Sequence, residues 1–268
     1  MHLSQPDIDA IAAAFVAARR EARILDAFPG PLPTSLADAY RVQERAIALG
    51  GRRLAGWKVA MIRPDLRANL GADRICGPIY ADVVHDLPQG GGATVTVYDG
   101  GFAALEAEFA ARFARDLEPG PDGFDDATIL AALASLHAGS EVASSPLPTL
   151  NDIGPVAVVC DHGNNAGAVV GPELPGWRTT APAAFASKML VDGVVEGEGS
   201  AASVPGGPLG ALRFLAEQLA TRGRHLAAGD VVLTGMTTGI HTVRPGSHGR
   251  IVFSGVSDCD IAVVAVER

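Results

Sequence analysis

Cysteine is scarce in this sequence and is not clustered. The three cysteines, Cys76, Cys160 and Cys259, lie far apart, and no Cys-x-x-Cys motif occurs. A small, odd and widely spaced set of cysteines favours the reducing cytoplasm and does not indicate a zinc site. We therefore expect a cytoplasmic protein.

Long apolar runs and an excess of positive charge are also missing. No run of about 18 apolar residues occurs, so we expect no transmembrane helix. The N-terminus lacks a basic stretch followed by apolar residues, so we expect no secretory signal. A formal net charge of −9 argues against nucleic acid and anionic membranes as partners.

Apolar residues, in contrast, are abundant. They make up 48% of the chain, and the mean hydropathy is +0.22. This surplus fits a homo-oligomer that buries part of its apolar surface between subunits.

The first third of the chain has helical patterns. With 268 residues, the chain can form one large domain or a small domain plus a large one. Ser4 is suited to cap a first helix and Ser35 a second, which Gly50-Gly51 would end. We predict a helical N-terminal region at 1–52 and a β-rich domain at 53–268.

The remainder has the patterns of strands and turns. Strands are expected at 54–60, 93–98, 155–160 and 229–234, and 250–253 and 260–266 are expected to form an antiparallel pair. A strand within 184–192 turns at Asp192-Gly193 into 194–197, as in a hairpin with a type I′ turn. Helices are expected at 125–137 and 208–220. Helices in front and strands behind predict an α+β fold.

Two glutamates one residue apart, Glu106 and Glu108, form the most informative short motif. On a strand both carboxylates would project to one face. Crowded carboxylates repel unless a proton or a cation lies between them, and Mg²⁺ suits such an oxygen-rich site. The neighbouring residues 102–117 are also good helix formers, and on a helix the two side chains would diverge. From these residues alone, a metal-binding pair and a solvated surface pair are both open.

Six segments of the chain carry a family resemblance. They are Gly56-Trp-Lys-Val-Ala60, Leu105-Glu-Ala-Glu-Phe109, Ser140-Glu-Val142, Cys160-Asp-His-Gly-Asn-Asn-Ala-Gly167, Gly229-Asp-Val-Val-Leu-Thr-Gly235 and Thr238-Gly-Ile-His-Thr-Val-Arg-Pro-Gly246. In order and separation they resemble the hydratase and decarboxylase branch of the fumarylacetoacetate hydrolase superfamily. The resemblance covers almost the whole chain. It is more specific to this branch than to one reaction.

The resemblance implies a fold and a metal site. The fold is the fumarylacetoacetase C-terminal-like one, a mixed β core with outer helices and a small helical N-terminal part, with 53–268 as the catalytic domain. The resemblance places Glu106 and Glu108 on a strand. It further implies that they bind Mg²⁺ or Mn²⁺ together with Glu141.

The resemblance also implies two catalytic residues. Lys58 would face the substrate and transfer protons or bind its carboxylate. Spacing alone leaves open a lysine that merely extends to solvent from a strand end. Asp161 would support metal-bound water or the substrate. His162 beside it is either a base or a loop histidine bonded to the backbone.

Substrate contacts are expected from a glycine-rich turn and from an amide. Backbone N–H groups around Thr234, Thr238 and Gly239 could hold a carboxylate, and a plain tight turn is the alternative. Asn164 and Asn165 stand where the family often has two serines. We expect Asn165 to contact the substrate, with hydrogen bonds different from those of a hydroxyl.

One departure from the family pattern concerns an acidic residue about twenty positions after the motif lysine. Asp73 matches a first aspartate there, whereas the later acidic position falls on Ile75 or Cys76. This weakens the assignment as a hydratase but not the metal site. We interpret Cys76 as a buried structural thiol rather than a nucleophile.

The expected activity is that of a metal-dependent lyase. It would add water to a 2-hydroxy-2,4-dienoate, the enol form of a 2-oxo-4-enoate, to give a 4-hydroxy-2-oxo acid in aromatic catabolism. The alternatives are a 2-oxo-3-enedioate decarboxylase of the 4-oxalocrotonate type, an acylpyruvate C–C hydrolase, and a non-catalytic partner subunit. The expected partners are a small 2-oxo acid, other copies of the chain, and a pathway decarboxylase or hydratase.

Overall fold

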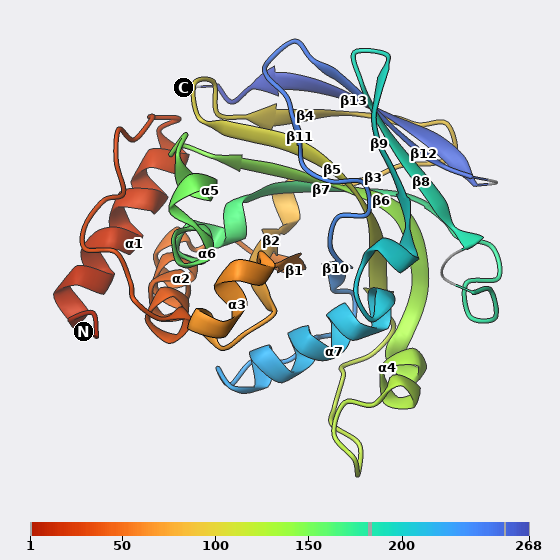
Figure 1. Ribbon diagram of the computed structural model, residues 1–268, viewed down its shortest axis with the longest axis horizontal. Helices are drawn as coiled ribbons and strands as arrows, with labels where there is room; N and C mark the ends of the chain where they lie inside the picture. Colours follow the sequence, from red (N-terminus) through yellow and green to blue (C-terminus); the bar gives the residue numbers. More distant parts are fainter. Residues whose placement is uncertain (1, 182–183, 255, 268) are drawn as a thin grey trace.

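The computed structural model describes residues 2–181, 184–254 and 256–267. Its helices are α1 (Gln5–Arg20), α2 (Leu36–Gly50), α3 (Pro64–Leu70), α4 (Asp126–Ala132), α5 (Leu150–Ile153), α6 (Pro155–Cys160) and α7 (Gly207–Ala220). Its strands are β1 (Leu54–Met61), β2 (Arg74–Tyr80), β3 (Val84–Asp86), β4 (Gly92–Val97), β5 (Phe102–Phe113), β6 (Leu133–Ser145), β7 (Asn165–Glu173), β8 (Ala186–Val191), β9 (Val194–Ser200), β10 (Val231–Leu233), β11 (His241–Thr242), β12 (His248–Phe253) and β13 (Ser257–Ala265). Figure 1 shows α1, α2, α5 and α6 gathered on one side of the strands.

The two N-terminal helices begin where the sequence predicts. The side chain of Ser4 accepts a hydrogen bond from the N–H of Asp7, and Ser35 caps α2 in the same way. Helix α2 ends at Gly51, which has a left-handed φ of 60°. Because α2 packs against α6 as well as α1, the helical region shares its core with the β-rich part of the chain.

The strands form two mixed sheets. Among the described residues, one sheet has the order β2-β1-β10-β5-β6-β7-β3, with β11 also paired to β5, and the other has the order β4-β13-β12-β8-β9. The pairs β1–β10, β3–β7 and β4–β13 are parallel, and the other pairs are antiparallel. Mixed sheets with helices outside them confirm the expected α+β fold.

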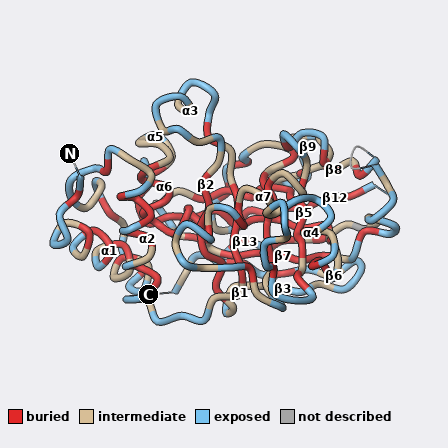
Figure 2. Tube along the Cα trace, turned by 90° about the horizontal axis from the view of Figure 1, so that it is seen from below, coloured by how far each residue is buried: buried red, intermediate tan, exposed pale blue. Residues whose placement is uncertain are grey.

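The two sheets pack against each other through one face of β5. Leu105, Ala107 and Phe109 alternate along this face and are fully buried, and the ring of Phe109 meets that of Phe253 edge to face at 5.3 Å. Figure 2 shows this buried centre running through the strands. The opposite face of β5 therefore carries the residues between them, including the two glutamates.

Two predicted elements are wrong. The segment 155–160 is helix α6 rather than a strand. Residues 156–160 are all buried, and a short, fully apolar run does not distinguish a buried strand from a buried helix. The helix predicted at 125–137 ends at Ala132, and the chain continues as β6 because it pairs with β5 over its whole length.

Other predicted elements are confirmed. Strands β8 and β9 join through Asp192 and Gly193, which both have positive φ, as a type I′ turn requires. Helix α7 and the antiparallel pair β12–β13 lie where expected. Among the described residues, no helix is both long enough and apolar enough to cross a membrane.

Candidate active site

Three glutamates meet on the face of β5 that points away from the second sheet. Glu106 pairs directly with Glu141 of β6, so the two side chains project to the same side. Glu108 follows two residues later on β5 and shares that side. One carboxylate oxygen from each residue lies within 4.8 Å of the other two. The strand that the sequence left uncertain therefore creates a compact acidic cluster, which we call the glutamate triad.

The triad is buried, and its electrostatics are unfavourable without a counter-charge. Burial, and after it the charge of Glu141, raises the pKa of Glu106 from 4.5 to about 8. The same two causes raise the pKa of Glu108 well above its ordinary value. Lys58 supplies a positive charge beside the triad, with its Nζ 2.9 Å from Oε2 of Glu141. One ammonium group thus faces three carboxyl groups.

The triad fits a hard divalent cation. Oε2 of Glu108 accepts a hydrogen bond from the N–H of Gly235 at 2.8 Å. Its other oxygen, Oε1, is buried and has no hydrogen-bond partner among the described residues. A buried carboxylate oxygen without a partner is costly. Oxygen ligands of this kind suit Mg²⁺, Mn²⁺ or Ca²⁺, so a cation would satisfy both the charge and the free oxygen.

Lys58 is buried inside the protein rather than extended to solvent. It lies on β1 with 2% of its side chain exposed. Burial would lower the pKa of Lys58, but the charges of Glu141, Glu106 and Glu108 together raise it above 10.5. Its Nζ also donates to Oδ1 of Asn164 at 3.2 Å. The lysine therefore stays protonated beside the triad at neutral pH.

Asn165 connects the triad to the segment that follows α6. Its Nδ2 donates to Oε1 of Glu141 at 2.9 Å. Asn164 and Asn165 thus contact Lys58 and Glu141 respectively, and the chain reaches this position through positive φ angles at His162, Gly163 and Asn164. These two amides help fix the geometry of the ammonium and of one carboxylate.

The glycine-rich turn after β10 lies against β5. Both the N–H and the hydroxyl of Thr234 donate to the carbonyl of Phe109. Thr238 forms a hydrogen bond with Nε2 of His241 at 3.0 Å, and Gly239 has a positive φ of 104°. Thr237, which no sequence motif singled out, holds the turn: its N–H and its hydroxyl both donate to the carbonyl of Ala107.

Asp161 lies in a buried ion pair with Arg19. Its carboxylate accepts hydrogen bonds from Arg19 at 2.5 and 2.9 Å. Burial would raise the pKa of Asp161, but the charge and hydrogen bonds of Arg19 and His162 lower it to about 2. Arg19 also donates to the backbone carbonyl of Asn165 at 2.9 Å. Its position four residues after Phe15, on the buried stripe of α1, is the signal that could have identified it.

Ile75 and Cys76, which stand where the family pattern has an acidic residue, project to opposite faces of β2. Gly77 pairs with Lys58 and Ile75 with Ala60, so both lie on the face of Lys58. Cys76 pairs with Val59 and projects to the other side, where its Sγ lies 3.2 Å from Nη2 of Arg222. Burial raises the pKa of the Cys76 thiol, consistent with a structural role. β2 therefore presents no carboxylate beside Lys58.

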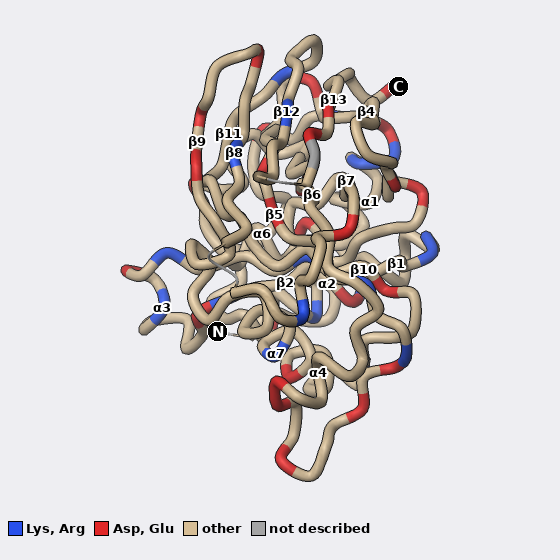
Figure 3. Tube along the Cα trace, turned by 90° about the vertical axis from the view of Figure 1, so that its right-hand side faces the viewer, with Lys and Arg blue, Asp and Glu red and all other residues tan. Residues whose placement is uncertain are grey.

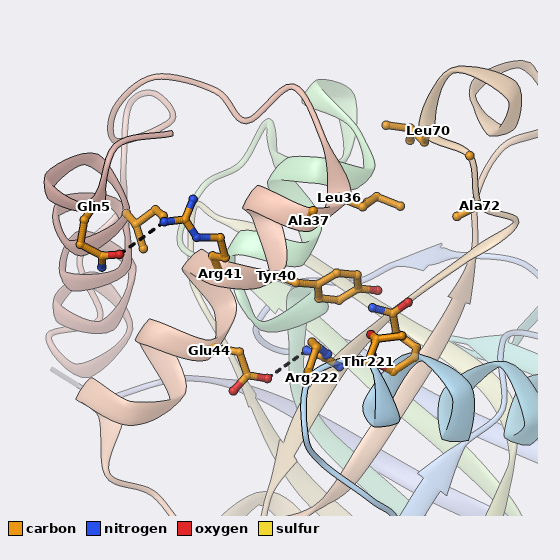
Figure 4. Close-up of a pocket in the computed structure, with 13 residues that line it drawn as sticks. Gln5, Leu36, Ala37, Tyr40, Arg41, Glu44, Leu70, Ala72, Thr221 and Arg222 are labelled. Atoms are coloured by element: carbon orange, nitrogen blue, oxygen red, sulfur yellow. Dashed lines mark hydrogen bonds and ion pairs between the residues drawn. The ribbon is translucent and has the colours of Figure 1, made fainter. Parts of the chain in front are cut away.

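A separate cavity of about 770 Å³ lies between α1, α2, α7 and the end of α3. Figure 4 shows Tyr40, Arg222 and Glu44 on its walls, with Leu70 and Ala72 at its far side. Its lining residues include neither Lys58 nor any glutamate of the triad. This cavity and the acidic cluster are therefore different features of the molecule.

Comparisons with known proteins find relatives over most of the chain. No protein-family model matches the chain. A 2-keto-4-pentenoate hydratase of Burkholderia vietnamiensis is 29% identical over 217 residues, which is 81% of this chain and 80% of that protein. A 4-oxalocrotonate decarboxylase of Pseudomonas putida is 26% identical over 226 residues, 83% of each chain.

Solved structures share the fold. A 4-oxalocrotonate decarboxylase from Pseudomonas putida G7, in complex with calcium and acetate, matches with a TM-score of 0.79 at 22% identity over 98% of this chain and 99% of that one. A fumarylpyruvate hydrolase from Pseudomonas aeruginosa, in complex with Mn²⁺ and pyruvate, matches with a TM-score of 0.56 at 17% identity over 78% of this chain and 89% of that one. In sequence the chain is thus similar to 2-keto-4-pentenoate hydratases and 4-oxalocrotonate decarboxylases, and it shares the fold of solved structures that include a fumarylpyruvate hydrolase.

Proposed function

We propose that the protein is a metal-dependent hydratase that converts a 2-hydroxy-2,4-dienoate and water into a 4-hydroxy-2-oxo acid. The observation that carries this proposal is the buried triad of Glu106, Glu108 and Glu141 with Lys58 beside it. The likeness to 2-keto-4-pentenoate hydratases over about four fifths of the chain supports the reaction class.

The proposed cofactor is Mg²⁺, with Mn²⁺ as a substitute. Glu106, Glu108 and Glu141 would hold it, because they supply three converging carboxylates and no soft ligand. Bound there, a divalent cation supplies Lewis-acid polarisation of the carboxylate and 2-oxo oxygens of the substrate. The solved 4-oxalocrotonate decarboxylase has been described with magnesium and adipate as well as with calcium and acetate.

Lys58 is proposed to move the protons of the reaction. Ketonisation removes the proton of the 2-hydroxyl group and adds one at C5. Water then adds across the new double bond, with oxygen at C4 and hydrogen at C3. A buried ammonium group 2.9 Å from Glu141 can donate a proton and recover it through that carboxylate. The raised pKa of Lys58 keeps the donor charged before the substrate binds.

The turn after β10 is proposed to bind the substrate. Gly235 of this turn donates its N–H to Glu108, so the turn reaches the triad, and Thr234, Thr238 and Gly239 are the residues proposed to contact the substrate. Oriented amides of this kind hold carboxylates. Asn165 is also proposed to contact the substrate, because its amide lies beside Glu141, whose Oε1 accepts a hydrogen bond from Nδ2 of Asn165.

Asp161 is proposed to act through its neighbours. Its carboxylate is occupied by Arg19, which also holds the carbonyl of Asn165. Asp161 would thus fix the segment that places Asn164 at Lys58 and Asn165 at Glu141. This role supports the substrate and the metal site indirectly.

A direct assay tests the proposal. The purified protein is incubated with 2-hydroxypenta-2,4-dienoate, and loss of the dienoate absorbance is followed with Mg²⁺, with Mn²⁺ and with excess chelator. We expect turnover with either cation, none with chelator, and a 4-hydroxy-2-oxo acid as product. Turnover that is unaffected by chelator would contradict the metal site.

A decarboxylase is the second candidate, and one observation favours it. Ile75 and Gly77, rather than an acidic residue, lie on the face of Lys58. Loss of CO₂ from a 2-oxo-3-enedioate needs the same polarised 2-oxo group but no activated water. Supplying that substrate and measuring CO₂ release separates the two reactions. An acylpyruvate C–C hydrolase would instead release two acids, and a non-catalytic partner subunit would turn over none of these substrates.

A homo-oligomer is part of the proposal. Val194 and Val195 on β9 and Ile240 beside the substrate turn are large apolar residues with 48–60% of their surface exposed. Contacts between copies would bury such residues. Light scattering after size-exclusion chromatography would give the subunit number, and a monomer would contradict this part.

A further inference from the structure

The hairpin of β8 and β9 lies directly on the turn proposed to bind the substrate. We propose that Gly197 and Gly199 of β9 are positioning residues that set the distance between this turn and the glutamate triad. This inference rests on the proposed function, because the turn is assigned to the substrate there. It adds a strand that belongs to the other sheet.

The approach of β9 to the turn leaves no room for a side chain. A Cβ atom on Gly199 would lie 1.9 Å from the backbone oxygen of Thr237. A Cβ atom on Gly197 would lie 2.3 Å from the backbone oxygen of Thr238 and 2.7 Å from Cε1 of His241. Neither glycine has a positive φ, so close approach alone requires glycine at these positions.

The turn is held from its other side by β5, the strand that carries Glu106 and Glu108. Both the N–H and the hydroxyl of Thr237 donate to the carbonyl of Ala107, at 2.8 and 2.9 Å. Ala107 lies between Glu106 and Glu108 on β5. Gly235, two residues before Thr237, donates its N–H to Glu108. The turn is therefore clamped between β9 and the strand of the two glutamates.

Strand β8 adds a polar contact to the clamp. Oγ of Ser187 and Oγ1 of Thr237 are 2.7 Å apart, and both residues are buried. Ser187 thus connects the hairpin to the same threonine that is bonded to β5. The hydrogen bond allows the clamp to be loosened without changing the backbone of β9.

The opposite side of β9 provides a matched control. Glu198 lies between the two glycines, is exposed, and pairs with Lys188 of β8. Figure 3 shows the acidic positions along this outer strand. Replacing Glu198 changes the same strand between the two glycines, but its side chain projects to the face that points away from the turn.

The size of the effect follows from the distances. A Cβ atom essentially never lies closer than 3.0 Å to a heavy atom outside its own residue and the two next to it in the chain. In Gly199→Ala the distance between the new Cβ and the backbone oxygen of Thr237 must therefore grow from 1.9 Å by at least 1.1 Å. Displacements of about 1 Å in a binding site can cost about a hundredfold in rate. We expect the turn to lose much of its grip on the substrate carboxylate while the triad stays in place.

Oxalate, a 2-oxo acid mimic, serves as the probe. Its binding to the Mg²⁺-loaded full chain is measured by calorimetry, and Mg²⁺ binding is measured separately. For Gly199→Ala and Gly197→Ala we expect the oxalate Kd to rise at least tenfold, with the Mg²⁺ Kd within threefold of wild type. In turnover, KM should rise more than kcat falls. Glu198→Ala should leave all of these values unchanged.

Ser187→Ala keeps the inference testable if the glycine variants do not fold. It removes one hydrogen bond, so the oxalate Kd should rise by about two- to tenfold. Folded glycine variants with wild-type oxalate affinity would overturn the inference, as would a Ser187→Ala variant without effect. If the wild-type protein binds neither Mg²⁺ nor oxalate, the proposed function itself fails, and this inference with it.

Discussion

The buried triad predicts an unusual dependence of stability on pH in the metal-free protein. The pKa of Glu106 is 4.5 when unfolded and about 8 when folded. Between these values the native state binds more protons than the unfolded state, so stability falls as the pH rises. The direction is opposite to that of a carboxylate held in a salt bridge.

The size of the effect follows from the same two values. Each tenfold change in proton affinity corresponds to about 1.4 kcal/mol. From pH 5 to pH 8 the ionisation of Glu106 therefore costs about 4 kcal/mol of unfolding free energy. Glu108, whose pKa is also raised, changes stability in the same direction. Saturating Mg²⁺ should remove most of this loss, since it stabilises the ionised carboxylates and binds only the native state.

The measurement is urea unfolding at pH 5, 6.5 and 8 with chelator, for the wild type and for Glu106→Gln. All other residues are the same in both proteins, so the difference between the two curves reports the triad. Between pH 5 and pH 8 we expect the unfolding free energy of Glu106→Gln to fall by about 4 kcal/mol less than that of the wild type. We also expect the variant to lose the stabilisation by Mg²⁺. Parallel curves for the two proteins would refute the reasoning.

Three further predictions concern the residues around the triad. Glu108→Gln should abolish both the rise in Tm with Mg²⁺ and the turnover, while circular dichroism stays native; retained turnover would exclude Glu108 as a ligand. Lys58→Met should lower kcat at least a hundredfold but keep the Tm rise with Mg²⁺, because it removes the proton carrier and a competing cation; near-normal kcat would remove Lys58 from the mechanism. Arg19→Met should destabilise the protein by about 3–5 kcal/mol by leaving Asp161 buried and unpaired, and adding Asp161→Asn should recover part of that loss; additive losses in denaturant unfolding would contradict the coupling.

Local signals in the sequence were sufficient for elements whose ends are chemically marked. Serine caps and a terminal glycine delimit α1 and α2, and Asp192-Gly193 marks the β8–β9 turn. These local signals failed where a segment is buried and so lacks alternating apolar and polar residues. The apolar run 155–160 is helical, and the helix expected to reach His137 yields at Leu133 to a strand that pairs with β5.

The sequence by itself determined the types of residue at the site and, through the family motifs, which of them belong together. Which side chains lie next to one another at the site depends on the tertiary structure. Only strand pairing sets Glu141 across from Glu106 and turns Cys76 away from Lys58 while Ile75 stays on its side. Only packing between distant segments brings Arg19 to Asp161 and the glycines of β9 to the turn after β10. These relations depend on strand register and on contacts between segments that are distant in the sequence, and local propensity carries no information about either.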